Sequence, residues 1–105
     1  MWYLVLSRDL DLDELKRTHR EAHANWLDDQ HRAGRMMFSG PGAGGQYGMY
    51  IILAPSMEEA RALAAQDPYH QHGVRDLERV LDWNPGRSLN LAGPSVSDLE
   101  GMARQ

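Results

Sequence analysis

The chain has 105 residues, of which 42% are hydrophobic and 25% charged, and its formal net charge is −4. This composition predicts one folded domain, and the 11 Lys and Arg residues are scattered among 15 acids, which excludes a basic stripe for nucleic-acid phosphates. The absence of cysteine excludes a disulfide framework or thiolate site and fits a reducing cytosol.

The N-terminal segment is rich in aromatic and aliphatic residues and predicts a strand over residues 2–7. Its apolar run is too short for a signal sequence or a membrane span, so we expect a cytoplasmic protein with no membrane partner. A helix is predicted over residues 12–33. Asp11 is placed to cap its start with Glu14 three residues later, and Gly34 supplies a left-handed exit.

This helix carries two histidines within its apolar face. On a helical wheel, His19 and His23 point in the same direction as the apolar side chains. Those apolar side chains are Leu15, Ala22, Trp26 and Leu27. Both imidazole rings are therefore predicted to point toward the core.

Two strands are predicted next, over residues 35–41 and 47–54, on either side of a glycine-rich loop. Such a loop can cradle phosphate, but this one lacks the lysine and the following helix of a P-loop. A flexible hairpin lip over a pocket is the better interpretation.

A capping box of Ser56 and Glu59 begins a second predicted helix over residues 56–66, which ends before a turn at residues 67–73. The pattern of residues 74–83 fits either a helix or a strand. The order of the preceding elements favours a closing strand.

The resulting order β-α-β-β-α-β is typical of a ferredoxin-like α+β fold, in which both helices lie on one side of a four-stranded antiparallel sheet. The run Met49–Ala54 shows no polar alternation, so the uncovered face of the sheet is expected to be apolar and to pack against a second copy in a homodimer. After Trp83 the tail is rich in turns, and Ser97 with Glu100 predicts a brief terminal helix.

With these elements placed, the chain resembles the YciI-like (YCII-related) family of dimeric α+β barrel proteins. The residues that carry the resemblance are Arg20-x-x-His23, Gly34-Arg35, Ser39-Gly40-Pro41 and Asp67-Pro68-Tyr69-x-x-x-Gly73. The resemblance implies a domain over residues 1–84. Residues 85–105 form a C-terminal extension, for which wrapping around a dimer partner is the only interpretation that the sequence offers.

The resemblance also implies that His23 and Asp67 form the polar centre of a pocket between the sheet and the helices, near the dimer interface. It implies a role with a small molecule, and the best-defined activity in the family is similar to removal of chloride from a chlorinated hydroxyhydroquinone. The tail, His19 and the segment His70–His72 depart from the family pattern, which bears on the substrate more than on the fold.

His23 has two interpretations. A lone inward histidine is usually a core residue whose ring is bonded to a carbonyl or an acid. A carboxylate from Asp67 would fix the tautomer and leave the other ring nitrogen to move a substrate proton. Asp67 precedes a proline, so it also fits a turn residue that ends a helix.

Arg20 is a candidate to anchor an anionic substrate group by a forked contact, or else a solvated charge that pairs with Glu14 or Glu21. Ser39, beside the glycine loop, is predicted to contact the substrate. A further set of large side chains belongs either to the apolar wall of the pocket or to the core, namely Tyr3, Trp26, Met37 and Tyr69.

His19 and His23 have the i, i+4 spacing that can hold one metal ion, and His70 with His72 would add ligands from the following turn. No H-E-x-x-H motif and no cysteine completes such a site. We therefore expect neither a physiological metal nor a cofactor.

These observations predict a cofactor-free lyase or isomerase that acts on a small polar or aromatic metabolite, and the family resemblance offers a dehydrochlorinase as one such enzyme. His23 is its expected general base or acid, and Asp67 orients the ring. The alternative is a non-catalytic metabolite-binding or accessory protein that uses the same pocket, because one fold can host either role.

Overall fold

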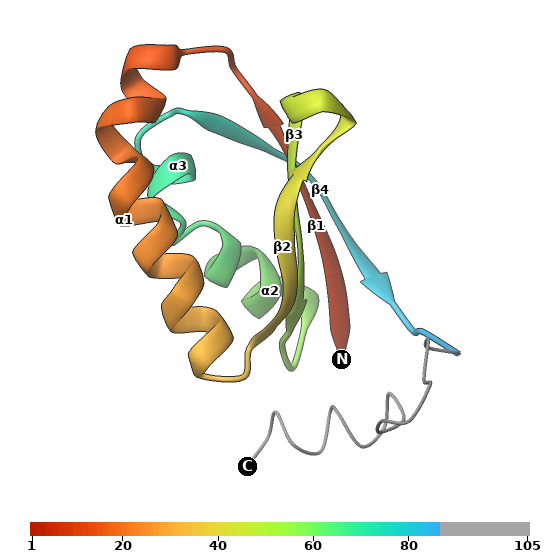
Figure 1. The fold of residues 1–105 in the computed structure, drawn as a ribbon. Coiled ribbons are helices and arrows are strands. Elements are labelled where there is room, and N and C mark those ends of the chain that lie inside the picture. Colours follow the sequence, from red (N-terminus) through yellow and green to blue (C-terminus); the bar gives the residue numbers. More distant parts are fainter. Residues whose placement is uncertain (87–105) are drawn as a thin grey trace, which may run out of the picture.

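The computed structural model describes residues 1–86, and the first strand lies inside a four-stranded sheet. β1 (Trp2–Asp9) pairs with β3 (Tyr47–Leu53) on one side and with β4 (Arg75–Trp83) on the other, and β2 (Met36–Gly42) pairs with β3. All three pairings are antiparallel, and the strand order is β2-β3-β1-β4 (Figure 1).

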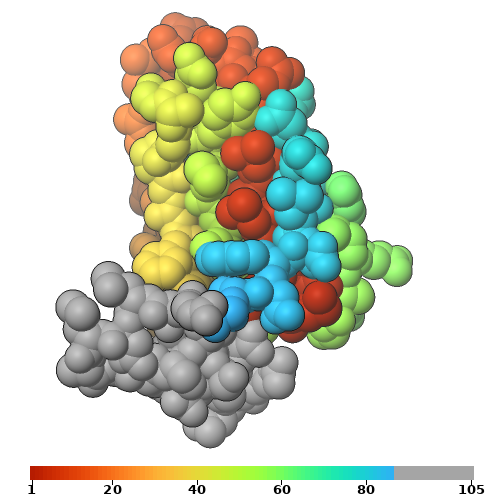
Figure 2. Space-filling model, turned by 90° about the vertical axis from the view of Figure 1, so that its right-hand side faces the viewer, coloured from red at the N-terminus to blue at the C-terminus, as the bar shows by residue number. Residues whose placement is uncertain are grey.

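Three helices lie on one side of the sheet, α1 (Asp13–Arg32), α2 (Met57–Ala64) and the short α3 (Pro68–Gln71) (Figure 1). A 3-10 turn, η1 (Ala43–Gly45), joins β2 to β3. Among the described residues no helix covers the opposite face, on which the four strands are seen side by side in Figure 2. The expected ferredoxin-like α+β architecture is confirmed.

The core lies between the sheet and the helices, because alternate residues of each strand point to opposite faces. Val5 of β1 and Ile52 of β3 point toward the helices and are fully buried. The same buried cluster contains Tyr3, Met36, Tyr50, Ala54, Ala60, Ala64 and Val80. No helix within residues 1–86 is both long enough and apolar enough to cross a membrane.

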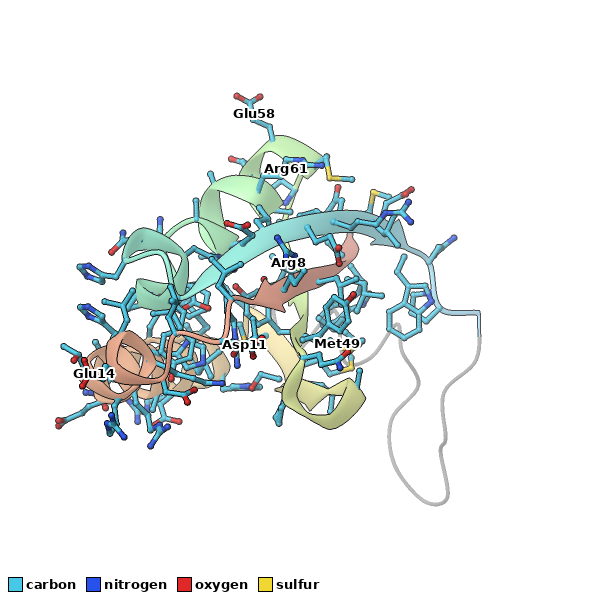
Figure 3. The ribbon with its side chains drawn as sticks, turned by 90° about the horizontal axis from the view of Figure 1, so that it is seen from above. Arg8, Asp11, Glu14, Met49, Glu58 and Arg61 are labelled. Atoms are coloured by element: carbon cyan, nitrogen blue, oxygen red, sulfur yellow. The ribbon has the colours of Figure 1, made fainter. Side chains whose placement is uncertain are left out.

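The start of α1 differs from the prediction. Leu12, and not Asp11, occupies the N-cap position, and no side chain caps this helix. Asp11 lies in the connection between β1 and α1 (Figure 3). Its φ is 58°, and its backbone N–H donates to the Asp9 carboxylate. The capping role predicted for Asp11 is therefore wrong, because the residue is used to turn the chain.

The second helix begins as predicted. Ser56 is the N-cap of α2, and its side-chain oxygen accepts a hydrogen bond from the Glu59 backbone N–H at 3.2 Å. Such a cap stabilises the helix by about 1 kcal/mol. It fixes the position from which α2 runs back across the sheet.

The segment after α2 also differs from the prediction. Residues 67–73 do not form a simple turn, because Pro68–Gln71 makes the short helix α3. The closing element is β4, as the element order indicated. The terminal helix predicted from Ser97 and Glu100, and the extension beyond Gly86, lie outside the described residues.

Candidate active site

Asp67 lies between α2 and α3 and is held there by hydrogen bonds to neighbouring residues. It is the N-cap of α3, where its carboxylate accepts the Tyr69 backbone N–H at 2.9 Å, and Pro68 fills the first helical turn. Asp at an N-cap followed by proline is a favoured way to begin a helix, because neither residue leaves a backbone donor without a partner. The side chain of Asp67 is 1% exposed.

His23 reaches this carboxylate from α1. Its Nδ1 lies 2.7 Å from Asp67 Oδ1, although the two residues are 44 positions apart in the chain. A carboxylate accepts hydrogen bonds, so Nδ1 carries the proton and donates it. Nε2 has no hydrogen-bond partner within residues 1–86. This nitrogen is left to act as an acceptor.

Tyr50 completes the surroundings of the carboxylate. Its hydroxyl donates to Asp67 Oδ2 at 3.2 Å. Burial raises the pKa of Tyr50 well above its usual value of 10, and the charge of Asp67 and the hydrogen bond to it act in the same direction. Tyr50 therefore stays a neutral donor. Three donors, from His23, Tyr50 and Tyr69, converge on one carboxylate.

The plane of the His23 ring is fixed by an aromatic neighbour. The ring stacks on that of Tyr69 with 3.8 Å between centroids and 6° between planes. The guanidinium carbon of Arg75 lies 4.9 Å from the centre of the same Tyr69 ring. Stacking from one side and the bond to Asp67 at one edge leave the imidazole a single orientation.

A cavity of about 140 Å³ lies beside this ring. It is lined by His23, Leu27, Ser39, Gly40, Pro41, Met49, Tyr50 and Arg75. A cavity of about 150 Å³ is large enough for benzene. Asp67 is not part of this lining, although it is hydrogen-bonded to the ring of His23. The arrangement presents one oriented imidazole to a space of the size of a small aromatic ring.

The other predicted binding residues lie in different places. Ser39 lines the cavity, and its hydroxyl is hydrogen-bonded to His31 Nε2 at 2.8 Å. Tyr3 is buried in the core, and Trp26 packs against the core. Arg20 is exposed on α1 and does not line the cavity. Of the predicted set, the structure brings together His23, Asp67, Tyr69 and Ser39.

The remaining histidines make contacts of their own. His19 and His72 stack with 3.8 Å between ring centroids and 4° between planes. His70 Nδ1 donates to the Ala64 carbonyl at 2.7 Å, so its Nε2 accepts from the Ser7 hydroxyl at 2.6 Å. Within residues 1–86 no group of three or more His, Cys, Asp or Glu side chains is placed to hold a metal ion.

Two residues of the site were not foreseen from the sequence, Tyr50 and Arg75. Tyr50 fits the apolar pattern of its strand, so nothing marks it as a hydrogen-bond donor. A signal for Arg75 does exist, because an isolated glycine within a strand often marks the close approach of another group. Gly48 lies in β3, and a Cβ there would collide with Arg75 Nη1.

Comparison with known proteins identifies the family to which the chain belongs. The family model of the YCII-related domain matches residues 1–84. The chain belongs to the YCII-related family. No curated protein matches this chain.

Among solved structures, this YCII-related protein is similar to 5-chloro-2-hydroxyhydroquinone dehydrochlorinase from Burkholderia phenoliruptrix AC1100, in its complex with 2,5-dihydroxybenzoquinone. The TM-score is 0.69 at 22% sequence identity, and the match covers 82% of this chain and 96% of the other. At this identity the likeness establishes the shared fold.

Proposed function

We propose that this YCII-related protein is a cofactor-free lyase or isomerase that acts on a small polar or aromatic metabolite. The observation that carries the proposal is the His23–Asp67 pair at 2.7 Å, whose second imidazole nitrogen has no partner among the described residues, on a ring that lines a cavity. An oriented imidazole with one free nitrogen is the usual arrangement of a general base.

The chemistry needs only this pair. Asp67 holds the Nδ1 proton, so the lone pair of His23 Nε2 accepts a proton from a C–H or O–H bond of the substrate. The electrons of that bond move into the substrate and expel a neighbouring group as an anion, or they shift a double bond. Loss of a proton and a chloride ion, the reaction class of the similar dehydrochlorinase, is balanced without any redox partner.

Replacement of His23 by Gln tests this role. We expect turnover to fall by about 10²- to 10⁴-fold, the usual contribution of a general base. The assay is chloride release from a panel of chlorinated and hydroxylated aromatics, starting with 5-chloro-2-hydroxyhydroquinone. Asp67→Asn, which disturbs the tautomer of His23, should also lower the rate.

His72→Gln is the matched control, because His72 is an exposed histidine that does not line the cavity. It should keep the wild-type rate. An undiminished rate in His23→Gln would contradict the catalytic role of this residue. A wild type that binds a compound of the panel without converting it would instead be a metabolite-binding protein.

We also propose that two copies associate through the open face of the sheet. Phe38 is 64% exposed and Leu81 is 38% exposed on the described chain. A contiguous exposed apolar patch, and not a single exposed side chain, marks an interface, and Leu4, Phe38 and Ile51 line one hollow on this face. The cytoplasmic location expected from the sequence stays a prediction.

A further inference from the structure

Arg75 is a buried cation in the wall of the same cavity as His23. It begins β4, and its side chain is 10% exposed. Among the residues that line the cavity there is no carboxylate. Placing a guanidinium in such a position is costly unless its charge is compensated.

The compensation from within the described chain is incomplete. Arg75 Nε lies 3.5 Å from Asp9 Oδ2, at the limit of a hydrogen bond. The same Asp9 oxygen accepts from Lys16 Nζ at the much shorter distance of 2.6 Å. Asp9 therefore balances one positive charge closely and a second only loosely.

The terminal nitrogens of Arg75 have no hydrogen-bond partner within residues 1–86. The group is nevertheless held in place. Its Nη1 lies against Gly48, where any side chain would collide with it, and its plane is near the Tyr69 ring. A fixed guanidinium with free terminal donors is the arrangement that binds a carboxylate or another oxyanion by a forked pair of bonds.

We propose that Arg75 binds an oxyanion of the substrate, so that this site takes an acidic small molecule. The group bound is a carboxylate or the ionised hydroxyl of an enol or phenol. The inference rests on the proposed function, because it assumes that the cavity beside His23 holds the substrate. It assigns to Arg75 the anchoring role that the sequence suggested for Arg20.

The two groups then divide the work. Arg75 binds the negatively charged oxygen of the substrate, and His23 Nε2 accepts a proton from another atom of the same molecule. Negative charge that develops on the substrate as His23 removes a proton would be stabilised by the same guanidinium. A neutral analogue of equal shape would leave Arg75 without a partner and bind weakly.

Calorimetric titration of the full chain at pH 7 tests the proposal with three probes, 2,5-dihydroxybenzoquinone, benzoate and benzamide. The hydroxyl groups of the quinone are vinylogous carboxylic acids and are ionised at this pH. Benzoate and benzamide have the same shape and differ in charge. We expect the wild type to bind the two anions and to bind benzamide at least about tenfold more weakly.

In Arg75→Met, affinity for the quinone should fall by about tenfold to a hundredfold. Arg61→Met is the matched control, because Arg61 is an exposed arginine of α2 that lies neither on the open face of the sheet nor in the lining of the cavity. It should bind as the wild type does. Gly48→Ala gives a second variant that removes no charge. Its new methyl group must displace the guanidinium, so affinity should fall again.

The proposal is overturned if the wild type binds neither anion, if benzamide binds as tightly as benzoate, or if both Arg75→Met and Gly48→Ala retain wild-type affinity. The two proposals fail separately. Loss of binding in Arg75→Met with normal turnover in His23→Gln would support the anchor and reject the base. Wild-type binding in Arg75→Met with an inactive His23→Gln would do the reverse.

Discussion

Asp67 is at once the N-cap of α3 and the partner of His23, and both roles use Oδ1. A structural role and a chemical role are therefore compatible in this residue. What distinguishes the site from an ordinary buried histidine is the environment of the second imidazole nitrogen. A purely structural ring would have this nitrogen bonded or packed, whereas the His23 ring borders a cavity.

Tyr50 gives a test of the electrostatics at this site. In the unfolded chain a tyrosine ionises near pH 10, but in the folded protein burial and Asp67 raise the pKa of Tyr50 well above that. Above pH 10 the unfolded state therefore binds fewer protons than the folded state. The contribution of Tyr50 to the free energy of unfolding is present below pH 10 and falls as the pH rises, by up to about 1.4 kcal/mol per pH unit.

Tyr50→Phe should remove this dependence. Urea unfolding at pH 8, 9, 10 and 11 would show a shallower alkaline decline in the variant than in the wild type. At pH 8 the variant should be less stable by about 1 kcal/mol, because Asp67 loses one donor. Parallel curves for the two proteins would contradict the assigned surroundings of Tyr50.

The sequence predicts part of this site well and part of it poorly. His23 stands out because a polar ring interrupts an apolar helical face, and Asp67 because it precedes a proline after a helix; the family resemblance joins them. Arg75 does not stand out, because an arginine at the start of a strand is ordinary on a surface. Its burial depends on the strand register that sets Asp9 opposite Arg75, and no local pattern encodes that register.

At the scale of secondary structure, Asp9 ties three elements together. It ends β1, accepts a hydrogen bond from Lys16 of α1 and lies beside Arg75 of β4. Burial alone would raise the pKa of Asp9, but the bonds from Lys16 and Asp11 and the nearby positive charges hold it below its usual value of 3.8. The prediction that Asp11 caps α1 failed because Asp11, whose backbone N–H is bound to Asp9, turns the chain at a φ of 58° and lies one residue before the N-cap, Leu12.

Asp9→Asn should weaken this junction. Because the pKa of Asp9 is lower in the folded state, its contribution to stability is present above pH 3.8 and is lost as the pH falls through the folded value. We expect a loss of about 1–3 kcal/mol at pH 7, measured by urea unfolding, and a smaller difference from the wild type below pH 4.

The control for this variant is Asp76→Asn, which breaks an exposed ion pair with Arg8. Pairs of this kind contribute about 0.2–1 kcal/mol, so its stability should stay near that of the wild type. Equal effects of the two substitutions at pH 7 would argue against a special role for Asp9.

At the scale of the whole molecule, the helices of residues 1–86 cover one face of the sheet (Figure 1) and leave the other face open (Figure 2). The sequence predicts this asymmetry because βαββαβ order places both crossovers on one side. A shallow hollow of about 250 Å³ on the open side is lined by Leu4, Phe38, Ser39, Gly40, Pro41, Met49, Tyr50 and Ile51. Five of these residues, Ser39, Gly40, Pro41, Met49 and Tyr50, also line the cavity of His23. A second copy on this face would therefore close one side of the candidate active site.

Charge on the open face should separate the copies. In the double variant Phe38→Glu/Leu81→Glu, two exposed apolar residues become carboxylates, which would be desolvated without partners in a sheet-on-sheet dimer. Because both positions are exposed in one chain, the fold should be retained. Sedimentation should give twice the chain mass for the wild type and the mass of one chain for the variant.

Leu12→Glu is the matched control, because Leu12 is 45% exposed but lies at the start of α1, away from the sheet face. It should sediment as the wild type does. If a second copy on the open face closes one side of the cavity, the monomeric double variant should also bind 2,5-dihydroxybenzoquinone more weakly than Leu12→Glu. Neither Phe38 nor Leu81 borders the cavity of His23, so the substitutions themselves do not explain such a loss. A wild type that sediments as a single chain at micromolar concentration would refute the dimer, and unchanged affinity in a monomeric variant would show that each chain forms its site alone.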